Sequence, residues 1–109
     1  MAIPLVVDTD GACDDALALW LGVASGLFEL SLVTTVAGAV PVEVATRNML
    51  SVMDSIGVAS VPVFQGADRP QVRELESSEH VLGRYGMSGV LLPEPSRQHL
   101  AGSAPEALV

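Results

Sequence analysis

The first 65 residues alternate between short apolar runs and longer segments with helical periodicity. Residues 3–7 form a continuous apolar run rich in β-branched side chains, which is typical of a strand buried in a parallel sheet. Further strands are predicted at 30–36 and 61–64, and helices at 14–25 and from Pro41 to the glycine at position 57. This β-α-β-α-β order predicts an α/β fold with a doubly wound, mostly parallel sheet.

The two predicted helices differ in their hydrophobic pattern. The helix at 14–25 is apolar almost all round, so we expect it to be covered on more than one side. The second helix repeats its apolar residues along one face. Trp20, Met49 and Met53 fall at core positions of these helices.

Beyond residue 65 the hydrophobic pattern loses its period. Residues 66–95 are rich in glycine, proline and mixed charge, and read as a long loop with one short helix near 72–78. Residues 96–109 read as a further loop and the start of a helix at Pro105. We therefore predict one domain, with its β-α-β-α-β core in residues 1–65.

Charge and cysteine content exclude several classes of protein. The formal net charge is −8 and all five basic residues are arginines, so binding to nucleic acid or to an anionic membrane surface is not expected. Cys13 is the single cysteine, which excludes a disulfide framework and a zinc site of paired cysteines. The sequence has no apolar run of membrane-spanning length and no secretory signal, so a cytoplasmic location is expected.

The apolar content is high for 109 residues. Hydrophobic residues make up 50% of the chain, charged residues only 17%, and the mean hydropathy is +0.48. A domain of this size has little interior in which to bury such a composition. The first strand of a doubly wound sheet is central, so we expect a sheet of so few strands to leave one of its edges unpaired. We also expect the chain to form a homo-oligomer or to pair with a completing chain.

Four of the six aspartates fall within eight residues, at positions 8, 10, 14 and 15. They follow the first predicted strand, at the edge where open α/β sheets bind ligands. Two carboxylates about 4 Å apart repel by about 4 kcal/mol at an effective dielectric of 20. A divalent cation is the simplest remedy, and ligands that are all oxygen favour Ca²⁺ or Mg²⁺ over zinc.

Five motifs occur in the order found in the inosine–uridine-preferring nucleoside hydrolases, a family that this sequence resembles. They are D-T-D-G-A-C-D-D-A-L-A-L at 8–19, T-T-V-A-G at 34–38, T-R-N at 46–48, V-P-V-F-Q-G-A at 61–67 and H-V-L-G-R-Y-G-M-S-G-V-L-L-P at 80–93. The resemblance implies the family's α/β fold and hydrolysis of a ribonucleoside by water to ribose and a free base, in purine or pyrimidine salvage.

The resemblance also implies a role for each aspartate. Asp10 would bind Ca²⁺ and act as the general base that activates the attacking water, and Asp15 would chelate the same ion. Asp14 would hydrogen-bond a ribose hydroxyl, and Asp8 would accept a hydrogen bond behind the metal ligands and orient the loop. His80, in the last motif, is a weaker candidate for contact with the substrate.

The sequence departs from the family pattern at several points. Ala39 replaces an asparagine after T-T-V-x-G, and Leu82 replaces a histidine in the last motif. Asn48 matches the pattern without a role that the sequence can derive. Family members are much longer than 109 residues and draw further metal and ribose ligands from their later parts, so we expect the chain alone to have little or no activity. The alternative is a non-catalytic fragment or subunit that acts as an interaction module completed by another chain.

Two other classes also place paired acids after their first strand, and both fit less well. Phosphohydrolases of the haloacid dehalogenase type and response-regulator receivers each need a lysine, and this chain has none.

Overall fold

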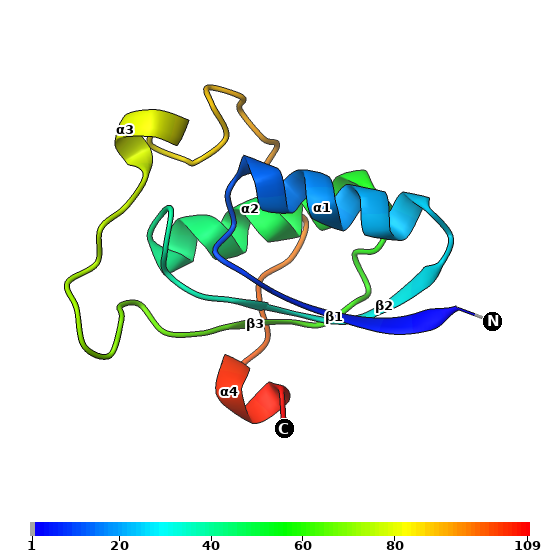
Figure 1. Ribbon diagram of the computed structural model, residues 1–109. Coiled ribbons are helices and arrows are strands. Elements are labelled where there is room, and N and C mark those ends of the chain that lie inside the picture. Colours follow the sequence, from blue (N-terminus) through cyan, green and yellow to red (C-terminus); the bar gives the residue numbers. More distant parts are fainter. Residues whose placement is uncertain (1) are drawn as a thin grey trace.

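A parallel sheet organises the molecule, whose computed structural model describes residues 2–109. Strands β1 (Ile3–Thr9), β2 (Phe28–Thr35) and β3 (Val63–Gln65) lie in the order β1-β2-β3 (Figure 1). Both neighbouring pairs are parallel, and the β1–β2 pair carries a register shift in the middle of β1. The α/β fold predicted from the order of the apolar runs is confirmed.

Helices lie on both faces of this sheet. Helix α1 (Cys13–Ala24) joins β1 to β2, and α2 (Val42–Ser55) joins β2 to β3, on the same face (Figure 1). Both helices share that face because right-handed crossovers between strands in sequential order turn to the same side. The short α4 (Ala104–Ala107) packs on β2 and β3 from the opposite face. Helix α3 (Glu79–Leu82) lies near the carboxyl ends of the strands.

The predicted strands and helices of the first 65 residues are all present, with ends displaced by one or two residues. Pro41 is the residue before α2 rather than part of its first turn, and extended backbone there turns the chain into the helix. Gly57 follows α2 with a φ of +79°, the left-handed conformation that ends many helices. The local signals therefore placed these ends closely.

The region after β3 corrects one prediction. The short helix expected at 72–78 is absent, and a single helical turn, α3, begins at Glu79 instead. Val72 is 94% exposed, so an apolar face of a helix at 72–78 would have had nothing to pack against. The Ser78 N–H donates to the Ala39 carbonyl at 2.8 Å, and the Ser78 carbonyl accepts from the Leu82 N–H at 2.8 Å. The helix predicted at Pro105 is present as α4.

The hydrophobic core lies between the sheet and α2. Met49 and Met53 are fully buried on one face of α2, as the periodicity predicted. They pack with other residues of α2 and with residues from β2, β3, α1 and the loop after α3, namely Leu50, Val52, Leu30, Val33, Val63, Leu19 and Met87. The core thus joins α2 to β2 and β3.

Helix α1 is covered on one side only, contrary to the expectation from its sequence. Leu19 is its fully buried residue, whereas Trp20 is 59% exposed and Leu17 and Leu21 are more than half exposed. No other element among residues 2–109 lies beyond this face. The outer edge of β1 is likewise unpaired within the described part of the chain, which confirms the expectation of a free edge.

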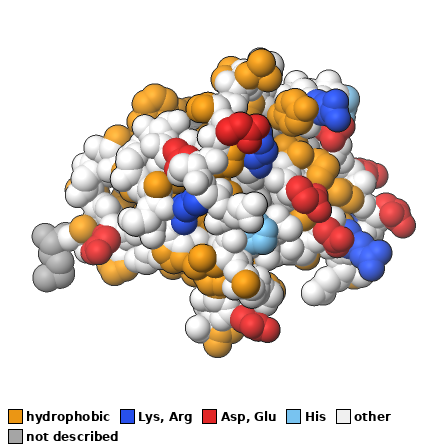
Figure 2. All heavy atoms as spheres, turned by 180° about the vertical axis from the view of Figure 1, so that it is seen from behind, with side chains coloured by type: hydrophobic (Ala, Val, Ile, Leu, Met, Phe, Trp, Pro, Cys, Tyr) orange, Lys and Arg blue, Asp and Glu red, His pale blue; other side chains and the backbone are white. Residues whose placement is uncertain are grey.

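Figure 2 shows that apolar side chains are also scattered over the face of the molecule it draws, with acidic and basic side chains among them. In the part of the chain that the structure describes, no helix has both the length and the apolar character needed to cross a bilayer.

Candidate active site

The aspartate-rich segment lies where β1 passes into α1. Thr9 ends the strand, and α1 begins at Cys13, so Asp10 lies on the connecting loop. Gly11 adopts a φ of +74°, and a Cβ there would lie 2.3 Å from the Ala45 Cα of α2. Only glycine fits this backbone, because it tolerates both the left-handed conformation and the close approach to α2.

The structure brings Asp10 and Asp15 together. Burial, a hydrogen bond to the Asp10 carboxyl and repulsion from its charge raise the pKa of Asp15, while hydrogen bonds from Thr9 and from the Gly11 backbone oppose the rise. This direction is expected for two facing acidic groups, since ionisation of one disfavours ionisation of the other. The two carboxyl groups therefore repel each other when both are ionised.

A backbone donor from the next loop fixes the Asp10 carboxylate. The Ala39 N–H donates to Asp10 Oδ2 at 3.0 Å. A Cβ on Gly38 would lie 2.6 Å from the same oxygen, so the carboxylate can approach this loop only because residue 38 is glycine. Although Ala39 lacks the asparagine side chain of the family pattern, its backbone still orients Asp10.

Thr9 orients the other carboxylate, a role that sequence reasoning missed. Its hydroxyl accepts from the Gly11 N–H at 3.0 Å and donates to Asp15 Oδ2 at 2.6 Å. The Asp8 carboxylate instead accepts from the Thr34 hydroxyl of β2 at 2.7 Å. The contact that ties the loop to the carboxylate pair is thus made by Thr9. A hydroxyl between two aspartates in the D-T-D motif was the available signal.

The remaining candidates lie further from the pair. Asp14 is exposed in the first turn of α1, next to Asp15 in the sequence, and its carboxylate accepts no hydrogen bond among residues 2–109. His80 is exposed on α3, and no hydrogen bond or ion pair joins its side chain to the aspartates in the described chain. The structure therefore groups Asp10 with Asp15, and leaves Asp14 and His80 open to solvent.

The oxygen atoms of Asp10 and Asp15 are the type of ligand that a hard cation prefers, but they are too few to complete its coordination. Asp10 and Asp15 offer carboxylate oxygens, which Ca²⁺ prefers, and their mutual repulsion would be offset by a positive charge. Within residues 2–109 no group of three or more histidine, cysteine, aspartate or glutamate side chains is arranged to hold a metal. Two carboxylates supply at most four of the six to eight oxygens that Ca²⁺ takes.

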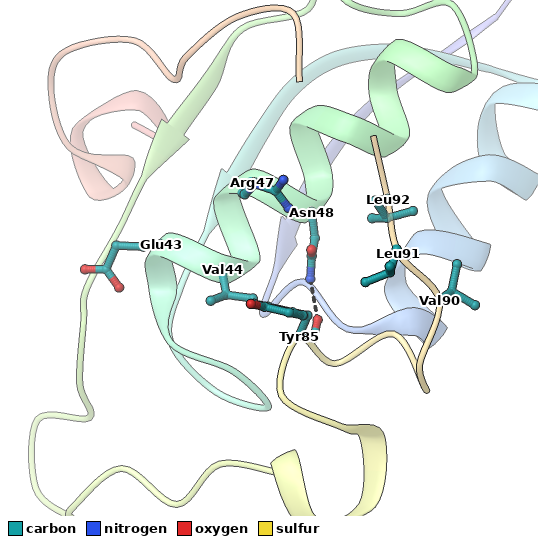
Figure 3. A pocket seen from close by; sticks show the side chains of 8 residues that line it. All are labelled: Glu43, Val44, Arg47, Asn48, Tyr85, Val90, Leu91 and Leu92. Atoms are coloured by element: carbon teal, nitrogen blue, oxygen red, sulfur yellow. Dashed lines mark hydrogen bonds between the residues drawn. The ribbon is translucent and has the colours of Figure 1, made fainter. Parts of the chain in front are cut away.

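A separate pocket of about 540 Å³ opens between α2 and the chain after α3 (Figure 3). Val44, Tyr85 and Leu91 give it an apolar wall, and Arg47 lies beside it with its guanidinium 2.6 Å from the Glu94 carboxylate. The aspartates do not line it. Asn48, whose role the sequence left open, also lines this pocket and donates from Nδ2 to the Tyr85 carbonyl at 2.7 Å (Figure 3).

The paired carboxylates lie at the carboxyl end of the first strand of a parallel α/β sheet, the edge at which open sheets of this class bind ligands. The sequence profile of the inosine-uridine preferring nucleoside hydrolases matches residues 5–109. The chain belongs to this family.

Curated relatives agree with this assignment. An uncharacterized protein of Schizosaccharomyces pombe is 41% identical over 105 residues, which cover 96% of this chain and 34% of the relative. The pyrimidine-specific ribonucleoside hydrolase RihA of Salmonella enteritidis is 38% identical over 108 residues, which cover 99% of this chain and 35% of the relative. The chain spans about a third of the length of these relatives.

Solved structures show the same relation. A purine-preferring ribonucleoside hydrolase from Gardnerella vaginalis superposes with a TM-score of 0.89 at 28% identity, over 96% of this chain and 34% of its own. A plant nucleoside hydrolase, PpNRh1, gives a TM-score of 0.90 at 26% identity, over 99% of this chain and 35% of its own. The fold of this chain is thus that of one third of a nucleoside hydrolase.

Proposed function

We propose that this chain carries the aspartate-rich part of a nucleoside hydrolase active site, in which the N-glycosidic bond of a ribonucleoside is cleaved by water. The carrying observation is the pairing of Asp10 with Asp15 at the carboxyl end of the sheet. Membership of the family, and relatives named as ribonucleoside hydrolases, supply the reaction class. A cytoplasmic location and a role in nucleoside salvage belong to the same proposal.

In this proposal Asp10 and Asp15 hold a Ca²⁺ ion. The ion would lower the pKa of a bound water and offset the repulsion between the two carboxylates. The Thr9 hydroxyl and the Ala39 N–H fix one oxygen of each carboxylate, so the two groups are oriented before any ion arrives. The oxygens still required must come from water, substrate or other protein groups.

Asp10 then acts as the general base. The water oxygen bonds to the anomeric carbon of ribose, the bond from that carbon to the base nitrogen breaks, and the water proton passes to the Asp10 carboxylate. The departing base leaves with the bonding electrons and takes up a proton from solvent water, and Asp10 afterwards returns its proton to solvent. Negative carboxylates close to the ribose favour the positive charge that develops on the sugar as this bond breaks.

Asp14 and His80 are the proposed substrate contacts. Asp14 lies one residue from Asp15 at the start of α1 and is exposed, so its carboxylate is free to accept a hydrogen bond from a ribose hydroxyl. His80 lies on α3. Ser78, the residue before this helix, donates its N–H to the carbonyl of Ala39, the residue whose own N–H donates to Asp10. This connection keeps α3 at the same end of the sheet as the aspartates.

The second candidate function is a non-catalytic unit completed by another copy or another chain. Its support is the unpaired edge of β1 together with the exposed face of α1. Both candidate functions lead to the same prediction for the isolated chain, because a pair of carboxylates alone is a poor Ca²⁺ site. We therefore propose little or no nucleoside turnover by the chain on its own.

Calorimetric titration with Ca²⁺ tests the metal site. Binding that is lost in Asp10→Asn and retained in Asp68→Asn supports the proposal, because both changes remove one negative charge and only the first touches the pair. Absence of binding to the unsubstituted chain at millimolar Ca²⁺ would contradict the metal site.

Release of base from inosine and from uridine, with and without Ca²⁺, tests the reaction. We expect no turnover above background by the chain alone. Turnover that depends on Ca²⁺ and is abolished by Asp10→Asn would overturn the proposed inactivity while establishing the reaction.

A further inference from the structure

Asn48 joins two segments that lie far apart in the sequence. The residue is 2% exposed, and its Nδ2 donates to the Gly11 carbonyl at 2.9 Å and to the Tyr85 carbonyl at 2.7 Å. Figure 3 shows the amide pointing from α2 toward the Tyr85 backbone. One buried amide group therefore uses both of its hydrogens to connect the aspartate loop with the loop after α3.

The same two segments also contact each other directly and press against α2. The Cys13 N–H donates to the Gly86 carbonyl at 2.9 Å. A Cβ on Gly86 would lie 2.8 Å from the Val40 Cγ1 atom, just as one on Gly11 would collide with Ala45. Both loops thus have glycine where they meet α2 or the residues before it, and Asn48 lies at their junction.

The chemistry of this junction requires an amide. Two carbonyl oxygens converge on one point, and a group with two N–H donors satisfies both at once. Aspartate has the same shape but, when ionised, offers acceptors only, and alanine offers neither the reach nor the donors. A buried carbonyl left without a donor costs free energy, so the loops would separate or admit water.

We infer that Asn48 is a positioning residue that fixes the Asp10–Asp15 pair by clamping the backbone of Gly11 to the loop at Tyr85. Asp10 directly precedes Gly11, and Asp15 receives the Thr9 hydroxyl that also accepts from the Gly11 N–H. Displacement of Gly11 therefore moves both carboxylates. The clamp itself is a property of the fold, and its effect on metal binding rests on the function proposed above.

Hydrogen exchange followed by NMR measures the clamp without any metal. In the unsubstituted chain, the Asn48 side-chain amide protons should exchange far more slowly than those of an exposed amide such as Gln71. In Asn48→Ala, the exchange rate of the Cys13 N–H should rise about tenfold more than that of the Val33 N–H, which bonds within the sheet region. The comparison with Val33 separates local opening of the loops from a general loss of stability.

Ser51→Ala is the matched control. Ser51 lies one turn further along α2, is equally buried, and donates from its hydroxyl to the Pro93 carbonyl at 2.6 Å. It thus makes the same kind of contact from helix to loop, away from the aspartates. We expect Ser51→Ala to leave the ratio of Cys13 to Val33 exchange unchanged.

The effect on the carboxylates is read from Ca²⁺ affinity. Asn48→Ala and the isosteric Asn48→Asp should each weaken Ca²⁺ binding about tenfold, and Ser51→Ala should not. Equal exchange changes at Cys13 and Val33, or rapid exchange of the Asn48 amide in the unsubstituted chain, would overturn the clamp. A localised exchange change with unaltered Ca²⁺ affinity would overturn the positioning role. If the unsubstituted chain takes up no Ca²⁺, the proposed metal site fails, and the exchange data alone decide whether the clamp exists. If neither Asn48 variant folds, the exchange rate of the Asn48 side-chain amide in the unsubstituted chain decides it.

Discussion

At the scale of single residues, backbone geometry decides what the aspartates can do. The D-T-D-G spacing predicted a cluster of carboxylates, and the structure pairs two of them. The spacing could not reveal that the Ala39 N–H and the Asn48 side chain orient the pair, because both of these contacts involve backbone atoms that any residue possesses. Side-chain chemistry was therefore predictable from the sequence, whereas its orientation required the fold.

Removal of one carboxyl from the pair should stabilise the metal-free chain. The pKa of Asp15 is higher in the folded state than its value of about 3.8 in the unfolded chain, so the folded chain keeps this proton to a higher pH. Stability from this group is thus present in acid and is lost as the pH rises through the folded pKa. In Asp15→Asn, the free energy of unfolding at pH 7 should rise by up to about 1 kcal/mol, a small gain because the group is only partly buried.

Urea denaturation at pH 4 and pH 7 without divalent cations checks this prediction. The gain should be smaller at pH 4, and Asp68→Asn should show neither the gain nor its pH dependence. A loss of stability in Asp15→Asn at pH 7 would contradict repulsion within the pair.

Gly11→Ala should be far more damaging than Gly26→Ala. Both glycines have similar positive φ angles, +74° and +71°, so the backbone cost of an alanine is about 1 kcal/mol at each. Gly26 has open space around it, whereas a Cβ on Gly11 would collide with the α2 backbone. We expect a loss of about 3 kcal/mol or more for Gly11→Ala, measured by denaturation. Equal losses would show that the loop can move away from α2.

At the scale of elements, α2 and α1 show why one helix was read correctly and the other was not. In α2 the apolar residues share one face, so periodicity alone identified the buried side. In α1 the apolar residues surround the helix, and the sequence carries no information on which of them the rest of the chain covers. The helix expected at 72–78 failed for a related reason, since helical propensity without a surface to pack against does not hold a short helix.

Substitutions in the two helices should separate buried from exposed apolar residues. Met49→Ala removes a fully buried side chain and should cost about 2 to 4 kcal/mol. Trp20 is larger but 59% exposed, and Trp20→Ala should cost less than about 1.5 kcal/mol in the isolated chain. Thermal and urea unfolding of both variants at low protein concentration measures the difference. A larger loss for Trp20→Ala would mean that its face is covered in solution.

At the scale of the whole molecule, the composition and the architecture agree. The surplus of apolar residues inferred from the sequence appears as the exposed face of α1 and the open edge of β1. A flat strand edge offers unpaired backbone donors and acceptors to another strand, and nearby apolar side chains strengthen the attraction. The net charge of −8 opposes association, and salt screens that opposition.

The isolated chain should therefore self-associate through β1, increasingly so at higher salt. Val6 lies on β1 and is half exposed, and a charge on an edge strand hinders pairing with a second strand. Val6→Lys should reduce the weight-average mass in sedimentation velocity at high protein concentration. Val72→Lys, which places the same charge on an exposed loop residue, should have a smaller effect because it leaves the strand edge open. An equal reduction in mass by both variants would assign the association to net charge rather than to β1. A monomer at every concentration and salt level would show that the exposed edge of β1 does not cause association.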